Sequence, residues 1–353
     1  MKIDFHTHCF PEKIAEKARI KLSNASGGLI PQTDCTADGL RREMKKDGVD
    51  ISVVMNIATN PRQQHSVNDF AASLISEDLI PFGSVHPNSP DALDELERIK
   101  SLGMKGVKFH PEYQGFYVDE ERMFPIYKKI SELGLITLFH AGGDIGFPPP
   151  YHGTPDRFLR ILNRFESPVV LAHWGGCFMC FDVLEKLAGF PVWFDTSFGY
   201  GTMPKACAQR ILDKHGAERL LLGSDMPWQR PLWSLALLNS LDMSDGDRAL
   251  IEYKNAQAAR NTVKKDKEIR KRASASEWFL FERRDFFRHE EKNFHRVLDV
   301  YPQIEVYVAA RSSVPRDAFL FRNVVKYHHR VDQVNFTVSV RVADNAVSTA
   351  QRG

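Results

Sequence analysis

Two histidines separated by one residue, His6 and His8, end the short apolar stretch that opens the sequence. Residues i and i+2 of a β-strand point to the same face, so two such imidazoles can bind one cation together. A catalytic metal site uses ligands of this kind and keeps one coordination position open. The spacing therefore indicates a metal site, with a pair of surface histidines as the alternative.

Polar residues also follow the later apolar stretches, at the expected carboxyl end of each strand. With the first pair, they are His6, His8, His86, His110, His140, His173, Asp195 with Thr196, and Asp225. A polar group in a barrel mouth costs free energy unless it is hydrogen bonded or coordinated. Because six of the 13 histidines take this position, the set favours a catalytic site over histidines with only structural roles.

The elements that would position these residues are eight apolar, β-branched stretches, each followed by a polar loop and an amphipathic stretch of helical period. Strands are predicted at 2–6, 51–57, 80–85, 106–110, 136–140, 169–173, 192–196 and 220–225. This alternation predicts a parallel sheet, and eight such units predict an α/β fold, the (β/α)8 TIM barrel. A doubly wound open sheet is the alternative, but no strand is followed by a Gly-x-Gly-x-x-Gly motif.

The composition is that of an ordinary globular chain of 353 residues, 43% of them hydrophobic and 26% charged. No apolar run approaches the roughly 18 to 20 residues of a membrane-spanning helix. Met1 leads into a strand without a signal-peptide pattern, so no membrane partner and a cytoplasmic location are expected. Five scattered cysteines favour reduced thiols. Residues 1–263 carry 29 Lys and Arg against 33 Asp and Glu, a net charge of −4, so no nucleic-acid partner is expected.

Four motifs in this order resemble the amidohydrolase superfamily, and most closely its amidohydrolase-related branch, which includes aminocarboxymuconate-semialdehyde decarboxylase and small lactonases. They are His6-Thr-His8, Phe139-His140-Ala-Gly, Ala172-His173-Trp-Gly-Gly and Gly223-Ser-Asp225-Met-Pro-Trp. The likeness covers residues 1 to about 263. It implies a metal-dependent TIM barrel with one divalent ion held by His6, His8, His140 and Asp225, and with His173 beside the metal-bound water.

The chemistry of this implied ligand set agrees with a hydrolytic site. Three neutral imidazoles and one carboxylate would leave Zn²⁺ with a net charge of about +1, which lowers the pKa of bound water towards about 7. Asp225 can then accept the proton of the water, and His173 can polarise a substrate carbonyl. Zinc is the first expectation, although imidazole and carboxylate also suit Mn, Fe and Co.

Six further residues are predicted to contact the substrate: Lys108, His110, His86, Asp144, His152 and Trp228. Lys108 is expected to form a salt bridge or to bind a substrate carboxylate. The alternative for Lys108, taken from other branches of the superfamily, is a carbamylated lysine that bridges two metal ions. Second-sphere hydrogen bonding is the alternative for His86. Asp144 and His152 lie in a Gly- and Pro-rich loop that either covers the mouth or is a rigid connector.

Residues 264–353 lie outside the barrel predicted for residues 1–263. They carry 18 Lys and Arg against 12 Asp and Glu, a net charge of +6, which fits a charged linker and a solvated helix. A helix over 276–298 and strands over 304–309, 319–327 and 334–342 predict a small C-terminal α+β appendage. Its apolar side is expected to pack on the barrel or on a second copy of the chain, so a homo-oligomer is one expectation.

The sequence thus predicts an enzyme that hydrolyses a small amide, ester or lactone with metal-activated water. The first alternative is a non-oxidative decarboxylase of a small unsaturated or aromatic acid on the same site, in which Lys108 holds the carboxylate. Outside enzymology, the alternative is a barrel recruited as a binding protein, and elemental analysis for bound metal separates it from the enzymes. Carbon dioxide release separates the two reactions.

Overall fold

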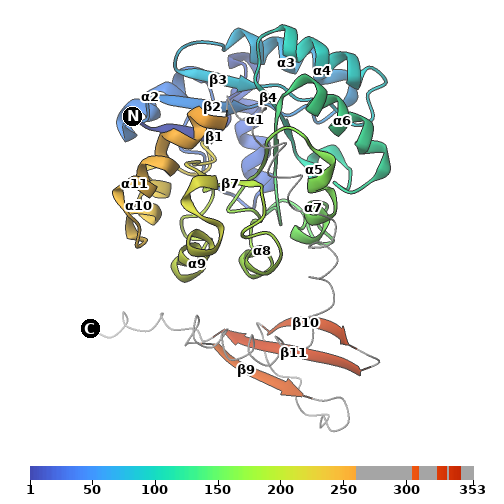
Figure 1. Ribbon diagram of the computed structural model, residues 1–353, viewed down its shortest axis with the longest axis vertical. Helices are drawn as coiled ribbons and strands as arrows, with labels where there is room; N and C mark the ends of the chain where they lie inside the picture. The colour runs from blue at the N-terminus through green and yellow to red at the C-terminus, as the bar shows by residue number, and fades with distance from the viewer. Residues whose placement is uncertain (260–303, 310–323, 332–333, 343–353) are drawn as a thin grey trace, which may run out of the picture. The chain divides into compact units, whose positions relative to one another are not determined.

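The structure is a computed structural model, and it describes residues 1–259, 304–309, 324–331 and 334–342. All eight predicted barrel strands are present, each within or beside its predicted range (Figure 1). They are β1 Ile3–Thr7, β2 Ile51–Met55, β3 Leu79–Phe82, β4 Gly106–Phe109, β5 Ile136–Phe139, β6 Val169–Leu171, β7 Trp193–Asp195 and β8 Leu220–Leu221.

The strands form two parallel sheets, in the orders β1-β2-β3 and β4-β5-β6-β7-β8. Backbone hydrogen bonds join the sheets at both seams. Gly83 N donates to Gly106 O over 3.0 Å between the end of β3 and β4, and Phe5 N donates to Leu222 O over 2.7 Å between β1 and the end of β8. The predicted (β/α)8 barrel is therefore confirmed.

Helices surround the ring of strands (Figure 1). The α-helices are α1 Glu12–Ala25, α2 Ala37–Asp47, α3 Gln64–Ser73, α4 Ala92–Ser101, α5 Pro111–Gln114, α6 Phe124–Leu133, α7 Pro155–Ile161, α8 Cys180–Lys186, α9 Lys205–His215, α10 Pro231–Ser240, α11 Asp245–Ala249 and α12 Asn255–Ala259. Short 3₁₀ turns are η1 Pro61–Gln63, η2 Glu121–Met123, η3 Leu162–Arg164 and η4 Ala217–Arg219, and η5 Leu250–Lys254 is a π-helix. Among the helices of the described residues, none is long and apolar enough to cross a membrane.

The strands bury both of their faces, as the strands of a parallel barrel do. Val53 and Met55 of β2 belong to an apolar cluster with residues from six other strands, which places that cluster in the barrel interior. Val54, between them, packs instead with Leu40 and Met44 of α2. The alternation along β2 thus directs one face inwards and the other towards the helices.

The C-terminal part contains a separate antiparallel sheet in the order β10-β11-β9. Its strands are β9 Ile304–Ala309, β10 Val324–Val331 and β11 Val334–Val342. The bounds of β9 and β11 agree with the prediction, and β10 lies later in the chain than the predicted 319–327. The predicted linker and the predicted helix over 276–298 fall outside the described residues. The chain divides into two units at residue 272, and the domain boundary at 263 stays a prediction.

Candidate active site

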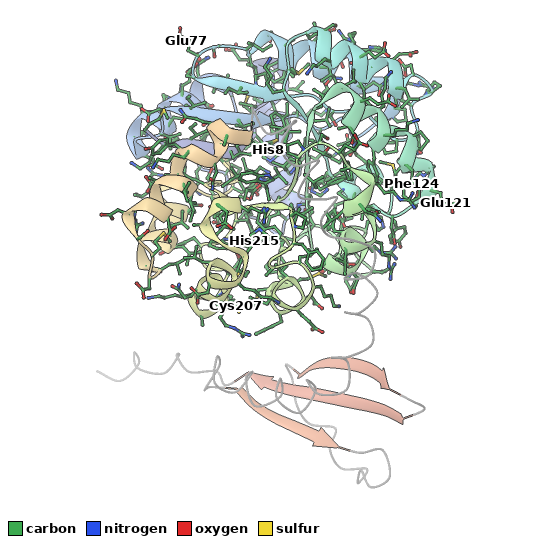
Figure 2. All side chains as sticks on the ribbon, viewed as in Figure 1. His8, Glu77, Glu121, Phe124, Cys207 and His215 are labelled. Carbon is green, nitrogen blue, oxygen red and sulfur yellow. The ribbon has the colours of Figure 1, made fainter. Side chains whose placement is uncertain are left out.

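A cavity of about 790 Å³, open to solvent, lies at the carboxyl ends of the barrel strands. Figure 2 shows His8 inside the ring of strands, whereas Cys207 lies on the outer helix α9. Nine predicted site residues line this cavity: His6, His8, Lys108, His110, His140, Asp144, His173, Asp225 and Trp228. They come from the ends of five strands, β1, β4, β5, β6 and β8, and meet in one cavity, as the prediction of a catalytic mouth required.

His6 and His8 present their Nε2 atoms 3.2 Å apart. The other ring nitrogen of each histidine has a fixed acceptor: His6 Nδ1 lies 2.8 Å from Asp195 Oδ2, and His8 Nδ1 lies 2.9 Å from the carbonyl oxygen of Met55. Because these oxygens only accept, both protons sit on Nδ1 and both Nε2 lone pairs remain available to a metal ion. Burial, followed by the charge of Lys108, holds the pKa of His6 well below its usual value, which keeps this ligand neutral.

Asp225 completes a set of three metal-ligand atoms. Its Oδ1 lies 3.1 Å from His8 Nε2 and 3.3 Å from His6 Nε2. The residue has a φ of 72°, a left-handed conformation that aspartate tolerates better than most residues. Its backbone N donates to His6 O over 2.8 Å, which fixes the carboxylate beside β1. Two imidazole nitrogens and one carboxylate oxygen fit a divalent transition metal, so the donor chemistry supports the implied ion.

His140, the fourth predicted ligand, lines the same cavity, but the potential ligand atoms near it belong to His110 and Asp144. Its Nε2 lies 3.1 Å from the carbonyl oxygen of Gly143 and therefore carries the proton, while its Nδ1 lies 3.0 Å from His173 Nε2. Its ring stacks on that of His110, with centroids 4.1 Å apart. The structure thus brings together three of the four predicted ligands, and a ligand role for His140 stays a prediction.

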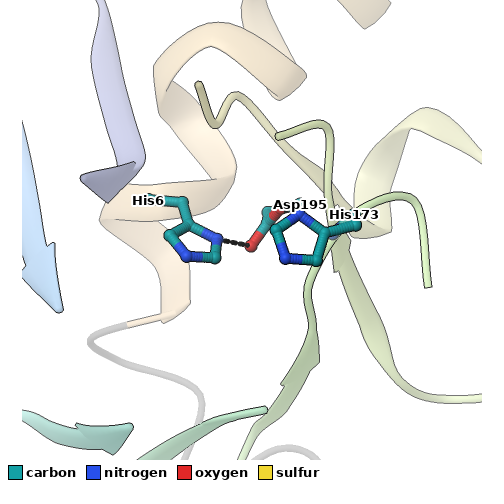
Figure 3. Close-up of side chains that lie close together, drawn as sticks. All are labelled: His6, His173 and Asp195. Carbon is teal, nitrogen blue, oxygen red and sulfur yellow. Dashed lines mark hydrogen bonds and ion pairs between the residues drawn. The ribbon is translucent and has the colours of Figure 1, made fainter. Parts of the chain in front are cut away.

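His173 is held by Asp195, which was predicted as a strand-end residue of the site without a stated role, and by Ser197, which was not predicted. Its Nδ1 lies 2.8 Å from Ser197 Oγ, and its backbone N donates to Asp195 Oδ1 over 3.0 Å. Ser197 Oγ also contacts that carboxylate, and it lies 3.1 Å from His6 Nδ1. Figure 3 shows the Asp195 carboxylate beside both imidazoles. The available signal was the pair Asp195 and Ser197 at i and i+2 after β7, and only Asp195 had been noted as a strand-end residue.

Lys108 lies in the interior of the barrel, only 1% exposed, with its Nζ 3.2 Å from His6 Nε2. Burial lowers its pKa to about 8, partly opposed by the charges of Asp195 and Asp225. Its ammonium therefore borders the candidate metal ligands at the closed end of the cavity. This position fits the predicted contact with a substrate anion, and that contact stays a prediction.

His110 and Asp144 lie next to each other in the wall of the cavity. His110 Nδ1 accepts from Tyr113 N over 3.4 Å, so the proton of the neutral ring sits on Nε2, which lies 3.3 Å from Asp144 Oδ2. Burial, followed by the charge of Lys108, holds the pKa of His110 well below its usual value. The two residues therefore form a hydrogen-bonded pair.

His86 and His152 are not among the residues that line the cavity. His86 Nδ1 accepts from Asn88 N over 3.1 Å, in a turn of its own loop. His152 Nδ1 lies 3.2 Å from Pro111 O, and its backbone N donates to Glu112 Oε1 over 2.8 Å. Both rings are thus engaged by backbone groups, and the structure does not bring them to the predicted substrate site.

The barrel part of the chain is similar to known proteins. The family model described as Amidohydrolase matches residues 3–259. A 2-amino-3-carboxymuconate-6-semialdehyde decarboxylase of Dictyostelium discoideum is 25% identical over 239 residues, which cover 58% of this chain. The match spans 64% of the length of that relative, less than two thirds.

Two solved structures share the barrel fold. The 5-carboxyvanillate decarboxylase of Sphingomonas paucimobilis has a TM-score of 0.58 and 17% identity, covering 74% of this chain and 98% of that chain. A dihydroxybenzoic acid decarboxylase of a Polaromonas species, with bound manganese and the inhibitor 2-nitroresorcinol, has a TM-score of 0.54 and 15% identity, covering 75% of this chain and 98% of that chain. At these identities the likeness shows the fold alone. Because the family model spans the whole barrel, the chain belongs to the amidohydrolase family.

Proposed function

We propose that the chain is a metal-dependent, non-oxidative decarboxylase of a small aromatic or unsaturated carboxylic acid. The observation that carries the proposal is the position of the Lys108 ammonium, 3.2 Å from His6 Nε2 and beside the three candidate ligands. A substrate carboxylate at this end of the cavity would meet two buried cations, the Lys108 ammonium and the ion held by the three candidate ligands. The relative from Dictyostelium discoideum and the two solved structures are decarboxylases, which supports the same reaction.

In this proposal His6 Nε2, His8 Nε2 and Asp225 Oδ1 hold the ion, and His140 is a candidate fourth ligand. When bound, a divalent ion supplies positive charge that stabilises the electrons left behind when carbon dioxide departs. Zinc was the first expectation from the sequence. Manganese, which is present in the Polaromonas relative, suits the same imidazole and carboxylate ligands.

The residues of the chain supply the other parts of the reaction. Lys108 orients the departing carboxylate, and the bond between this group and the substrate carbon breaks to release carbon dioxide. The electron pair stays on the carbon, which then takes up a proton from the Asp225 carboxyl. His173, oriented by Ser197 and Asp195, lies within the same cavity and positions the reacting part of the substrate.

Hydrolysis of an amide, ester or lactone, which the sequence analysis placed first, becomes the second candidate. The same three ligands suit the activation of water, which is the observation in its favour. A buried ammonium next to the ligands is useful for an acid substrate, whereas a neutral amide or lactone does not require it. The relatives therefore support the decarboxylase better.

The deciding experiment uses the full-length chain reconstituted separately with Mn²⁺ and Zn²⁺. Carbon dioxide release from a panel of hydroxybenzoates and muconate-like acids is measured beside proton release from small lactones and amides. We expect carbon dioxide release that disappears when the metal is removed by a chelator. Proton release from lactones with no carbon dioxide from any acid would instead establish the hydrolase.

A further inference from the structure

Among the residues that line the cavity, the charges are unevenly placed. Lys108 is the only lysine or arginine that the described part of the chain contributes to the lining, and it lies beside His6. The carboxylates in the lining are Asp225, which belongs to the candidate metal ligands, and Asp144, which belongs to the loop after β5. With a bound divalent ion the end that contains Lys108 and Asp225 would be cationic, whereas Asp144 contributes a carboxylate beside His110.

Asp144 is held in place by its own loop. Its Oδ1 accepts from Gly146 N over 2.7 Å, and Gly143 N donates to Cys177 O over 2.9 Å. Gly142 pairs with both Gly153 and Cys177, and a Cβ at position 142 would lie 2.3 Å from Cys177 N. The loop therefore packs too closely on its neighbour to shift freely, and the carboxylate has a defined position before any substrate arrives.

The other carboxylate oxygen, Oδ2, keeps the capacity to accept further hydrogen bonds. It lies 3.3 Å from His110 Nε2 and 3.9 Å from His140 Nε2, at the wall of the cavity. A carboxylate oxygen accepts two hydrogen bonds, so one position next to the His110 contact remains for a donor on a bound molecule. Much of the remaining wall is apolar: Phe10, Leu22, Ile57, Tyr113, Phe198 and Trp228. This wall suits a flat ring between the two polar ends.

We propose that Asp144 restricts the site to acids with a single carboxylate, bound at Lys108, that carry a hydroxyl or amino donor on the side facing Asp144. This inference rests on the proposed function, because the carboxylate at Lys108 is the group that departs. It adds a substrate class, a ring acid with a hydrogen-bond donor, and it excludes ring dicarboxylates. The donor gains a charge-assisted hydrogen bond to Oδ2.

A second carboxylate would instead meet the Asp144 carboxylate at close range. Like charges a few ångströms apart repel strongly in a site that is only partly solvated, and Lys108, the one lysine among the described residues of the lining, is engaged with His6 instead. The expected penalty is a loss of affinity of at least about tenfold, and it should depend on the charge of residue 144.

The test measures equilibrium binding by calorimetry, so that it does not depend on turnover. The full-length chain loaded with Mn²⁺ is titrated with benzoate, 3-hydroxybenzoate and isophthalate, which share one ring and differ at the position expected to face Asp144. The wild-type chain should bind 3-hydroxybenzoate most tightly and isophthalate at least about tenfold more weakly than benzoate. This comparison needs no variant and therefore does not depend on the folding of one.

Asp144→Asn then tests the cause. This variant should bind isophthalate nearly as well as benzoate, while its affinity for benzoate changes by less than about threefold. Asp156→Asn is the matched control, since Asp156 is half exposed on α7 and pairs with Lys186 outside the cavity. The control should keep the wild-type preference.

The inference is overturned if the wild-type chain binds isophthalate as tightly as benzoate, if Asp144→Asn keeps the wild-type preference, or if none of the three acids binds. Failure of the proposed function looks different: the predicted binding preference is then found, but no acid of the wider panel releases carbon dioxide.

Discussion

Two clusters in one cavity have the same composition, two histidines and one aspartate, and opposite hydrogen-bonding states. In the first, His6 and His8 commit their Nδ1 protons to Asp195 and Met55, which leaves both Nε2 atoms free beside Asp225. In the second, which contains His110, His140 and Asp144, the Nε2 protons point at oxygen atoms. The difference teaches that proximity of donor atoms alone does not define a metal site, because the partner of the opposite ring nitrogen decides which lone pair is available.

The largest expected effect comes from removing the carboxylate of the first cluster. Asp225→Asn should lower carbon dioxide release on the order of 10³-fold, because both the ion and the proton donor are affected. Elemental analysis should find well below one metal ion per chain. Asp144→Asn, the matched change in the second cluster, should keep the full metal content, and loss of metal from that variant would refute the contrast between the clusters.

The next effect concerns the ammonium that lies beside the first cluster. Lys108→Met should weaken the binding of benzoate by about 10- to 100-fold, since a charged hydrogen bond is lost, and should retain the metal. The pKa of about 8 gives the sign of the pH dependence: Lys108 is charged below pH 8, so wild-type affinity should fall as the pH rises through 8. Titrations between pH 6.5 and 9.5 check this.

The matched control for that experiment is Lys105→Met, which changes an exposed lysine before β4 that does not line the cavity. It should bind benzoate like the wild-type chain and keep the same pH dependence. If Lys108→Met binds benzoate as well as Lys105→Met does, the position of the substrate carboxylate in the proposal is wrong.

A third measurement uses a buried histidine that lies outside both clusters. His215 stacks on Phe194 with ring centroids 4.0 Å apart, and its Nδ1 accepts from Gly189 N. Burial lowers its pKa to about 3, so the unfolded chain binds the proton first as the pH falls below 6.5. This residue should therefore cost the folded state about 2 kcal/mol of unfolding free energy between pH 7 and pH 5.

His215→Gln should flatten that part of the pH dependence in urea unfolding curves and leave the metal content unchanged. An unchanged slope between pH 7 and pH 5 would contradict the assignment. The comparison separates a histidine that is buried for packing from those whose lone pairs serve a ligand (Figure 2 labels His215).

The smallest effect is expected at the residue that links His173 to the first cluster. Ser197→Ala removes the contact with His173 Nδ1 and should lower carbon dioxide release by about tenfold, with the metal retained. Ser234→Ala is the control, since the buried Ser234 hydroxyl has no hydrogen-bond partner among the residues that the structure describes. Equal rates for the two variants would argue that Ser197 is not needed to orient His173.

The strands could be predicted from the sequence because alternation and β-branched composition are local properties. The convergence of His6, His8 and Asp225 was also predictable, since strand ends of a parallel barrel meet at one rim. The hydrogen bond that fixes His6 was not, because Asp195 lies 189 residues away and only the folded barrel brings the two together.

The roles of the loop histidines were harder to predict, because their contacts also depend on the folded barrel. His86 and His152 were expected at the substrate, yet the His86 ring accepts from Asn88 N in its own turn, and His152 Nδ1 contacts Pro111 O at the start of α5. Nothing in the local sequence distinguishes such a partner from a ligand. Likewise, His140 fits a ligand motif, while its ring orientation depends on Gly143 and His173.

The candidate metal ligands also lie at the seam between the beginning and the end of the barrel. His6 and His8 belong to the first strand region and Asp225 follows the last strand, and His8 N donates to Met226 O over 2.6 Å across that seam. The complete ligand set therefore exists only after synthesis has reached residue 225 and the ring has closed. A bound ion would link the first strand region to the last, so that metal binding and closure of the ring stabilise each other.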